Sequence, residues 1–439
     1  MAPATAPRPA DPSAHALAAR VLDRCDRLAR HTDEPGRITR LYLSDATRAA
    51  HAELRGWMID AGLTVRTDNA GNLIGRRPAA DDVPDGTPAP RVLLLGSHLD
   101  TVPDAGRYDG VLGVMIALAA VEALAAEPLA MHIDVVGFSE EEGVRFDRPY
   151  LGSAAAAGTF DPGWLRRNDA SGASLQWAIE RFGLDPTAIA QDAYDPAEVL
   201  GYTEVHLEQG PVLASAGRPG GVVTAIQGQS RLRVRFVGKP AHAGTTPMDA
   251  RQDALAAAAH WMVRVQSVGR ATGDLRATVG QVEVGPGARN VVPGIAELSL
   301  DVRHDLDDVR RSATDGLLHE AGQIAEDQGV RFEVLDAQDQ PATPMDPALS
   351  QALEGAMQDA DLEPARLPSG AGHDAVAMAA LGPVAMLFVR DPGAASHHPD
   401  ERVEVEDVAA AVGTLTAYIR RLAAAIDGSP HDAAGKVSR

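Results

Sequence analysis

The sequence predicts an α/β protein that has a mostly parallel sheet and a smaller module inserted into the chain. Apolar runs of strand length alternate with helical segments over residues 91–206 and again after residue 341, which is typical of a parallel sheet covered by helices. Near residue 222 the pattern changes to half-exposed strands. The chain has 439 residues, which is too long for one ordinary core, so more than one domain is expected.

The first part of the larger domain is expected to span residues 13–222. Its periodicity predicts helices at residues 14–30 and 111–126 and strands at residues 91–97, 132–139 and 203–206. A surface loop is expected at residues 79–90, which are rich in Pro and Asp. Residues 1–12 and 427–439 are predicted to be disordered tails because of their Pro, Gly, Ser and charge content.

The inserted module is expected over residues 223–340. Arg alternates with apolar residues over residues 230–237, which predicts a half-exposed strand. The expected elements that follow are a helix at 250–268, strands at 277–284 and 296–302, a helix at 306–328 and a strand at 330–335. The order β-α-β-β-α-β indicates a ferredoxin-like module.

The larger domain is expected to resume over residues 341–426. Its expected elements are helices at 347–361 and 404–426 and a strand at 383–389.

Composition excludes several classes of partner. The net charge of −21 argues against nucleic acid and anionic membranes, because no basic surplus exists to neutralise phosphates. Cys25 is the one cysteine, so neither an intramolecular disulfide nor a zinc-thiolate site can form. No signal-peptide pattern and no apolar run of membrane-spanning length is visible. A cytoplasmic location is therefore expected.

Histidine and carboxylate residues follow three of the predicted strands. His98 and Asp109 follow the first, three Glu residues at 140–142 follow the second, and His206 ends the third. Ligands bind at strand ends in open α/β sheets. Imidazole and carboxylate are ligands for divalent metals, zinc above all, with Mn, Co and Ni also compatible. The pattern therefore predicts a metal-dependent hydrolase.

Each of these motifs also has an ordinary explanation. Asp109 could simply cap the following helix, and the Glu residues at 140–142 could form a solvated acidic turn. Asp100 could orient His98 through a carboxylate–imidazole hydrogen bond, or the two residues could be a loop His beside a helix-start Asp. Either His397 or His398 could bind metal, and residue type alone leaves this open.

Other segments offer groups for a substrate. Arg303 could bind a carboxylate with two hydrogen bonds, or it could form a surface ion pair with Asp301. Gly370 and Ala371 lie in a Gly-rich turn before a helix, which suits backbone N–H groups that bind an anion.

Together the motifs resemble those of the dinuclear-metal amidohydrolases that include allantoate amidohydrolase, N-carbamoyl-L-amino-acid hydrolase and β-ureidopropionase. The parent group also contains aminoacylases and carboxypeptidases. The resemblance covers about residues 15–425. The matching segments occur in the family's order at residues 96–101, 106–110, 141–146, 206–211, 241–244, 290–294, 369–374 and 396–397.

The resemblance implies two divalent metal ions per subunit. One ion would be held by His98, Asp109 and His206, and the other by Asp109, Glu142 and His397. It also implies three catalytic roles: Asp100 orients His98, Glu141 is the general base, and His242 reaches the partner subunit's active site. The residues that would bind substrate are Gln209, His242, Asn290 and Arg303, together with Gly370 and Ala371 of the Gly-rich turn.

The implied fold is a catalytic domain of the zinc-aminopeptidase and carboxypeptidase type with an inserted lid, which forms a homodimer. The implied reaction cleaves the ureido C–N bond of allantoate or of an N-carbamoyl-L-amino acid and releases ammonia and carbon dioxide. Two alternatives are an aminoacylase or dipeptidase that acts on N-acyl amino acids or peptides, and a non-catalytic metal-binding scaffold. The turns at residues 103–105 and 286–289 differ from those of relatives, so the substrate's identity stays open.

Overall fold

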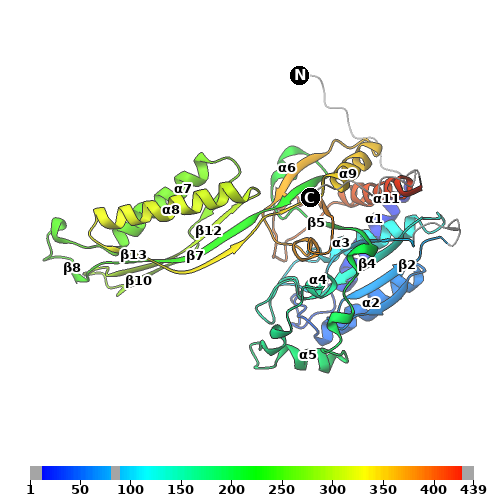
Figure 1. The fold of residues 1–439 in the computed structure, drawn as a ribbon, viewed down its shortest axis with the longest axis horizontal. Helices are drawn as coiled ribbons and strands as arrows, with labels where there is room; N and C mark the ends of the chain where they lie inside the picture. Colours follow the sequence, from blue (N-terminus) through cyan, green and yellow to red (C-terminus); the bar gives the residue numbers. More distant parts are fainter. Residues whose placement is uncertain (1–11, 81–88, 428–439) are drawn as a thin grey trace, which may run out of the picture. The chain divides into compact units, whose positions relative to one another are not determined.

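The computed structural model describes residues 12–80 and 89–427, which form two compact units (Figure 1). Unit 1 contains the described residues up to Thr224, Met345–Leu367, and those from His373 onward. Unit 2 contains Ala225–Pro344 and Pro368–Gly372. The predicted tails lie outside the described residues, except for Pro12 and Asp427, which are helical. Most of the predicted loop at 79–90 also lies outside them.

The larger sheet is mixed. Its strands run in the order β1-β2-β4-β3-β5-β16-β6-β14, and β15 pairs with β6. The central strands β4, β3, β5 and β16 pair in parallel, whereas the outer pairs are antiparallel. The prediction of a mostly parallel sheet is wrong at the edges, because apolar runs do not encode the direction of pairing. The strands are β1 (Thr64–Thr67), β2 (Leu73–Arg77), β3 (Val92–His98), β4 (His132–Phe138), β5 (Val199–Leu207), β6 (Gly220–Ile226), β14 (Thr343–Pro344), β15 (Ala365–Ser369) and β16 (Val384–Val389).

The long helices of unit 1 pack against one another and against one face of this sheet. Helix α3 (Val111–Ala123) is apolar and almost wholly buried. It contacts α1 (Pro12–Leu28) and α11 (Val405–Asp427), and α11 also contacts α9 (Pro347–Asp359). The core they share with the strands takes alternate residues, such as Leu93 and Leu95 of β3. Since strand residues alternate between faces, His98 and His206 belong to the opposite face.

The remaining helices of unit 1 are shorter or lie against the edge strands. Helix α2 (Asp45–Asp60) contacts β1 and β2, and α10 (Ala375–Met378) contacts α4 (Leu151–Ala156) as well as β5 and β16. The others are α5 (Leu175–Phe182) and α6 (Val212–Ala216). Among the described helices, none combines the length and apolar character that a membrane span requires.

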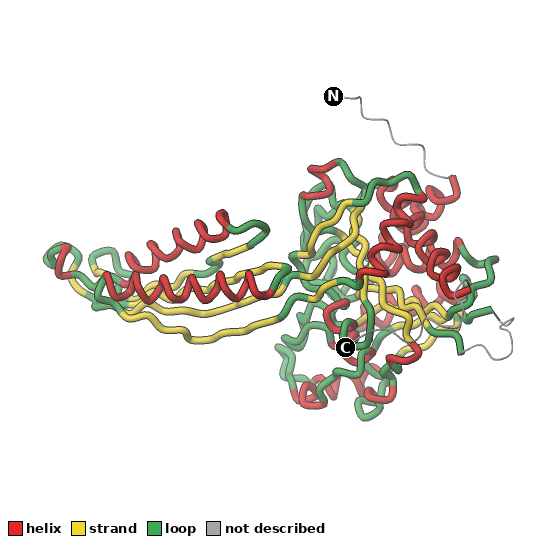
Figure 2. The backbone as a smooth tube through the Cα atoms, turned by 45° about the horizontal axis from the view of Figure 1, so that its top comes forward, coloured by secondary structure: helices red, strands yellow, loops and turns green. Residues whose placement is uncertain are grey.

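Unit 2 has its own antiparallel sheet in the order β10-β12-β7-β13, with β9 paired to β12. Helices α7 and α8 pack on this sheet (Figure 2). Along β7, Leu232, Val234 and Phe236 are buried against them, whereas Arg231 and Arg233 are exposed. The elements are β7 (Gly228–Val237), β8 (Ala241–His242), α7 (Ala254–Ala271), β9 (Arg276–Thr278), β10 (Val282–Gly285), β11 (Val291–Val292), β12 (Ile295–His304), α8 (Asp307–Asp327) and β13 (Arg331–Gln340).

The largest differences from the predicted extents in unit 2 concern two of its strands. The strand predicted at 277–284 is two short strands, β9 and β10, because the chain leaves the ladder between Thr278 and Val282. The last strand continues to Gln340 and contains a bulge between Val334 and Asp336. A bulge shifts the alternation of side chains by one position, which hides the second half of a strand from pattern analysis.

Candidate metal centre

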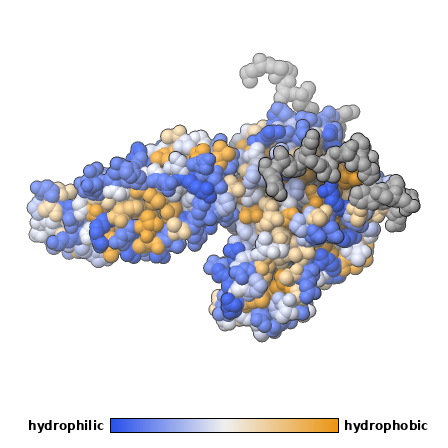
Figure 3. Space-filling model, in the orientation of Figure 1, coloured by the Kyte–Doolittle hydropathy of each residue, from blue (hydrophilic) through white to orange (hydrophobic). Residues whose placement is uncertain are grey.

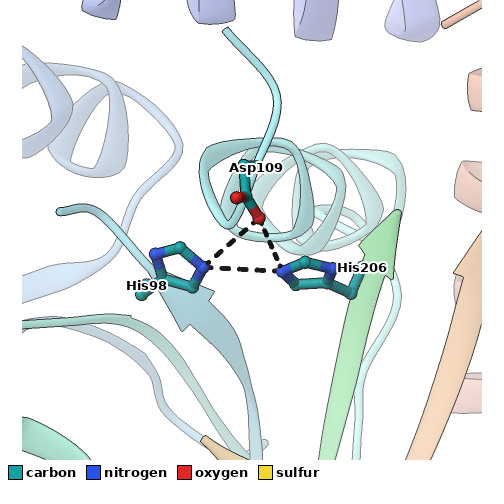
Figure 4. Close-up of side chains that lie close together, drawn as sticks. All are labelled: His98, Asp109 and His206. Carbon is teal, nitrogen blue, oxygen red and sulfur yellow. Dashed lines mark hydrogen bonds and ion pairs between the residues drawn. The ribbon is translucent and has the colours of Figure 1, made fainter. Parts of the chain in front are cut away.

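The carboxyl ends of the central strands bring together three predicted metal ligands (Figure 4). His98 is the last residue of β3, His206 lies near the end of β5, and Asp109 precedes α3. Asp109 Oδ1 lies 3.6 Å from His98 Nε2 and 3.1 Å from His206 Nε2, and the two Nε2 atoms are 3.5 Å apart. All three side chains are buried.

A second group uses the other oxygen of Asp109. His397 Nε2 lies 3.2 Å from Asp109 Oδ2 and 3.3 Å from Glu142 Oε1. Asp109 thus faces two sets of possible ligands, one on each carboxylate oxygen. His398 is exposed and lies 3.6 Å from Asp400. Of the two adjacent histidines, the structure brings His397 to the cluster.

The start of α3 is shaped to fit against His98. Gly110 has φ +67°, and a Cβ on it would come within 2.5 Å of three ring atoms of His98. Glycine therefore allows Asp109 and the helix to approach the imidazole. Gly110 is also the N-cap residue, and no side chain caps the helix. The alternative that Asp109 serves only as a helix cap is wrong.

The acidic turn after β4 separates its three Glu side chains. Glu140 has φ +55°, is buried, and accepts hydrogen bonds from the backbone N–H groups of Arg145 (2.7 Å) and Phe146 (3.1 Å). Glu141 and Glu142 instead group with His98. The solvated acidic turn is therefore not what forms, because Glu140 and Glu141 are both buried.

Asp100 contacts His98 through a different atom from the one expected. The Nδ1 atom of His98 lies 3.0 Å from the backbone oxygen of Asp100 but 3.7 Å from its carboxylate, which is too long for a hydrogen bond. The carboxylate instead accepts from the backbone N–H groups of Glu141 (3.1 Å) and Glu142 (3.2 Å). The prediction about Asp100 is corrected accordingly, since its side chain holds the acidic turn.

The arrangement of donor atoms suits a cation. His98 Nδ1 faces the Asp100 carbonyl, and His206 Nδ1 faces the Leu207 carbonyl at 3.0 Å. Carbonyls only accept hydrogen bonds, so each Nδ1 carries the proton. Neutral imidazoles would then direct two Nε2 lone pairs at one another and at Asp109. Such a group needs extra protons or a cation to be stable, and its donors are those that divalent metals prefer.

The pKa shifts in the cluster also indicate a site that attracts cations. Burial raises the pKa of Glu141 well above its usual range, and although His98 opposes this, Glu142 and Asp374 add to it. Hydrogen bonds to Asp109 and Glu142 raise the pKa of His397 to about 10. A carboxyl group whose pKa is raised holds a proton more readily than an ordinary carboxyl group, which is a property that general acid–base catalysis uses.

Several residues that contact the cluster were not predicted from the sequence as site residues. Glu204 and His373 form a further buried group with His206. The alternation along β5 places Glu204 on the same face as His206 and could have indicated it. The buried Glu401 accepts from the backbone N–H groups of Tyr108 (2.7 Å) and Asp109 (3.1 Å). No sequence signal links it to residues almost 300 positions away.

Gln209 lies beside the cluster. It has φ +54°, and its Nε2 donates to Ser396 Oγ at 2.7 Å and to Asp109 Oδ1 at 3.2 Å. This predicted substrate-binding residue therefore contacts a predicted metal ligand.

The other predicted substrate-binding residues belong to unit 2, where they lie in two groups. His242 lies opposite Val291 in the β8–β11 ladder, and Ala243 N donates to Asn290 O at 2.9 Å. Arg303 donates to both Asp301 oxygens at 2.8 and 2.9 Å and to Gly370 O at 2.6 Å. Ala371 follows Gly370, and its N–H donates to Ser369 Oγ at 3.2 Å.

Known proteins resemble this chain over most of its length. Residues 94–421 match peptidase family M20/M25/M40. An allantoate deiminase from Arabidopsis thaliana is 40% identical, over 88% of this chain and 79% of its own. An N-carbamoyl-L-amino acid amidohydrolase from Geobacillus stearothermophilus is 39% identical, over 88% and 94%. The crystal structure of a hydantoinase/carbamoylase-family amidase from Burkholderia multivorans has a TM-score of 0.84 at 31% identity and covers 92% and 97%.

Proposed function

The chain belongs to peptidase family M20/M25/M40, and we propose that it is a metal-dependent amidohydrolase. Its reaction is cleavage of the ureido C–N bond of allantoate or of an N-carbamoyl-L-amino acid, with release of ammonia and carbon dioxide. The main support for this proposal is that His98, Asp109 and His206 converge beside Glu141. Similarity to relatives that are named for these substrates supports the choice of reaction.

Two divalent metal ions fit this site. His98, Asp109 and His206 would hold one, and Asp109, Glu142 and His397 would hold the other. Zinc is our first candidate, and Mn, Co and Ni suit the same donors. When bound, the ions would supply Lewis acidity, which lowers the pKa of water and polarises the substrate carbonyl.

Glu141 is the group that moves the proton in this proposal. It takes a proton from the attacking water and returns it to the departing nitrogen, so it must hold a proton for part of each cycle. Its raised pKa favours this. The Asp100 carboxylate binds the backbone N–H groups of Glu141 and Glu142 and so fixes the turn that carries the base.

Unit 2 would supply the groups that orient the substrate. Arg303 would bind the substrate carboxylate with two hydrogen bonds. With Arg303, Asn290 and Gln209 would bind the carboxylate and ureido ends of the substrate. The turn of Gly370 and Ala371 would add backbone N–H groups, and that of Ala371 would first have to leave the Ser369 Oγ atom to which it donates. His242 would stabilise the negative charge that develops on the carbonyl oxygen, acting in the site of the partner subunit.

We further propose that unit 2 is a ferredoxin-like lid and dimerisation domain, corresponding to the predicted module at 223–340. It exposes large apolar side chains such as Met248, Val263 and Leu306. Figure 3 shows orange hydrophobic areas among the hydrophilic surface of this unit. Exposed apolar area of this kind supports a homodimer. The cytoplasmic location and the absence of a nucleic-acid partner stay predictions.

The test of the proposed function is metal analysis combined with a substrate panel. The panel contains allantoate, N-carbamoyl-L-amino acids, β-ureidopropionate and N-acetyl amino acids. We expect two metal ions per chain and ammonia release from a ureido compound. Hydrolysis of N-acetyl amino acids alone would support the aminoacylase or dipeptidase alternative. Bound metal without turnover of any compound would support the scaffold alternative.

A second experiment tests the role of His242 across subunits. His242→Ala and Glu141→Gln should each be inactive, and a mixture that allows subunits to exchange should regain activity in heterodimers. Absence of recovery in verified heterodimers would contradict the assignment of His242 to the partner's site.

A further inference from the structure

One face of the unit 2 sheet carries charged side chains outside the buried core. Two cross-strand pairs on this face have the same composition: Arg235 lies opposite Glu297, and Arg231 lies opposite Asp301. In each pair the Arg Nε atom donates to the carboxylate, at 2.8 Å and 3.2 Å respectively. The second pair also includes Arg303, two residues beyond Asp301 on β12. The two pairs therefore form a natural comparison.

Asp301 holds the guanidinium of Arg303 along one edge. The Nε atom of Arg303 donates to Asp301 Oδ1 at 2.8 Å, and Nη2 donates to Oδ2 at 2.9 Å. The other terminal nitrogen, Nη1, donates to the carbonyl of Gly370 at 2.6 Å. The guanidinium is thus fixed at three points by groups of its own unit. Two of these points come from Asp301.

This arrangement leaves Arg303 able to bind an anion. A guanidinium has five N–H groups, and the hydrogen bonds described for Arg303 use three of them. The two that remain lie one on each terminal nitrogen, and two is the number that a carboxylate accepts from Arg. The Arg303 side chain is 26% exposed, so these groups are within reach of a ligand.

Asp301 does not neutralise Arg303, because it is shared with a second cation. Arg231 also donates to Asp301, so two Arg residues and one Asp carry a net positive charge. Arg276 lies directly opposite Arg303 in the β9–β12 ladder and adds another positive charge on the same face. The group is basic within a chain whose net charge is −21. A ligand carboxylate is therefore attracted even while Asp301 stays ionised.

We propose that Asp301 is a positioning residue that presets Arg303 for the substrate carboxylate and thereby determines the preference for acids over uncharged ureides. The inference rests on the proposed function, since it refines the substrate class of that site. An Arg side chain that is already held loses less conformational freedom when the ligand binds. The alternative is an exposed ion pair with no role in binding, as in the Arg235–Glu297 pair.

The test compares Asp301→Asn with Glu297→Gln in the full-length, metal-loaded protein. Both changes remove one carboxylate charge from a cross-strand pair on the same face. We expect Asp301→Asn to raise KM for the ureido acid about tenfold with kcat within about twofold, which is the signature of lost uniform binding. Glu297→Gln should leave KM and kcat unchanged. On the carboxamide of the same substrate, Asp301→Asn and the wild type should have equal kcat/KM.

Several outcomes would overturn the proposal. It fails if Asp301→Asn and Glu297→Gln change KM equally, or if KM of Asp301→Asn stays within about twofold of the wild type. It also fails if Asp301→Asn lowers kcat/KM for the carboxamide by the same factor as for the ureido acid, because the effect would then be structural. Metal content and thermal unfolding of each variant show whether the fold is intact.

A binding experiment separates failure of this inference from failure of the proposed function. Succinamate carries a CH₂ in place of the ureido N–H of N-carbamoylglycine, and its binding can be measured by calorimetry without turnover. If no ureido compound is hydrolysed but succinamate binds about tenfold more weakly to Asp301→Asn, the function is wrong and the role of Asp301 stands. If ureido acids are hydrolysed and succinamate binds both proteins equally, the function stands and the inference is wrong.

Discussion

The two units place their charges in opposite surroundings. In unit 1, His98, Asp109 and His206 are at most 3% exposed, so their charges interact strongly and must be balanced within the cluster. In unit 2, the side chains of Asp301 and Arg303 are 30% and 26% exposed, and water screens their attraction. Charge balance therefore decides whether the first group can exist. In the second, the direction of the guanidinium matters more than the energy of the pair.

The sharpest way to test the buried group is to change its two adjacent carboxylates separately. Glu141→Gln should keep both metal ions and lose about 10²–10⁴-fold in kcat, which is the range for a general base. Glu142→Gln should lose metal, because it removes one of the proposed ligands. Metal analysis and turnover of the two variants measure this. Near-normal activity of Glu141→Gln would show that the base is another residue.

The exposed group is tested by removing its cation. Arg303→Ala should lower kcat/KM for ureido acids by about 100-fold, the amount expected for a charge-assisted bidentate contact, with most of the change in KM. Arg235→Ala removes an equivalent cation from the other pair and should have little effect. Steady-state kinetics of both variants provide the measurement. Unaltered affinity of Arg303→Ala for acids would exclude the anchor role.

Steric constraint on the buried group is tested at Gly110. Gly110→Ala places a Cβ 2.5 Å from the His98 ring and forces φ +67° on an L-residue, so we expect metal affinity to fall about 10–100-fold. Gly56→Ala is the control, because Gly56 lies in α2 with open space around it. That change should stabilise the protein by up to about 1 kcal/mol. Competition with a chelator reads out metal affinity, and equal affinities in both variants would contradict the steric argument.

Two buried histidines of unit 1 contrast in their charge environment. Burial lowers the pKa of His51 to about 3, and nearby Arg side chains add to this. Neither ring nitrogen of His51 has a hydrogen-bond partner among the described residues. Carboxylates raise the pKa of His98 well above its usual value even though burial alone would lower it. The same side chain is thus expected to be neutral at one position and to attract protons or metal at the other.

The contrast predicts a pH dependence. Between pH 6.5 and 3 the unfolded chain binds a proton at His51, whereas the folded chain does not. Proton binding at His51 therefore does not lower the free energy of unfolding above pH 6.5, but lowers it increasingly as the pH falls below 6.5. When the pH falls from 7 to 5, the free energy of unfolding of the wild type should decrease by about 2 kcal/mol more than that of His51→Phe. Unfolding of both proteins at the two pH values measures this. His319→Gln changes an exposed histidine and should lose as much unfolding free energy between pH 7 and pH 5 as the wild type. The prediction would be contradicted if His51→Phe also lost as much as the wild type.

Much of the architecture could be predicted because it depends on local patterns. The apolar runs predicted β3, β4 and β16 to within one or two residues, and helical periodicity predicted α3, α8 and α11 within three. The elements that were not predicted include β1 and β2, which form one edge of the sheet, and α2, which contacts them; all three carry weaker patterns. Burial on both sides gives central strands their continuous apolar signal, whereas edge strands lack it.

The sequence by itself determined that histidines and carboxylates follow buried strands, since strand length and side-chain alternation are local properties of the chain. Only the tertiary structure decided which atoms meet. It turned the Asp100 carboxylate to the acidic turn and brought His397, rather than His398, to Asp109. It also placed Glu401 on the backbone of Asp109. These contacts join segments far apart in the chain, and their geometry depends on how strands pair and loops return, which no local pattern encodes.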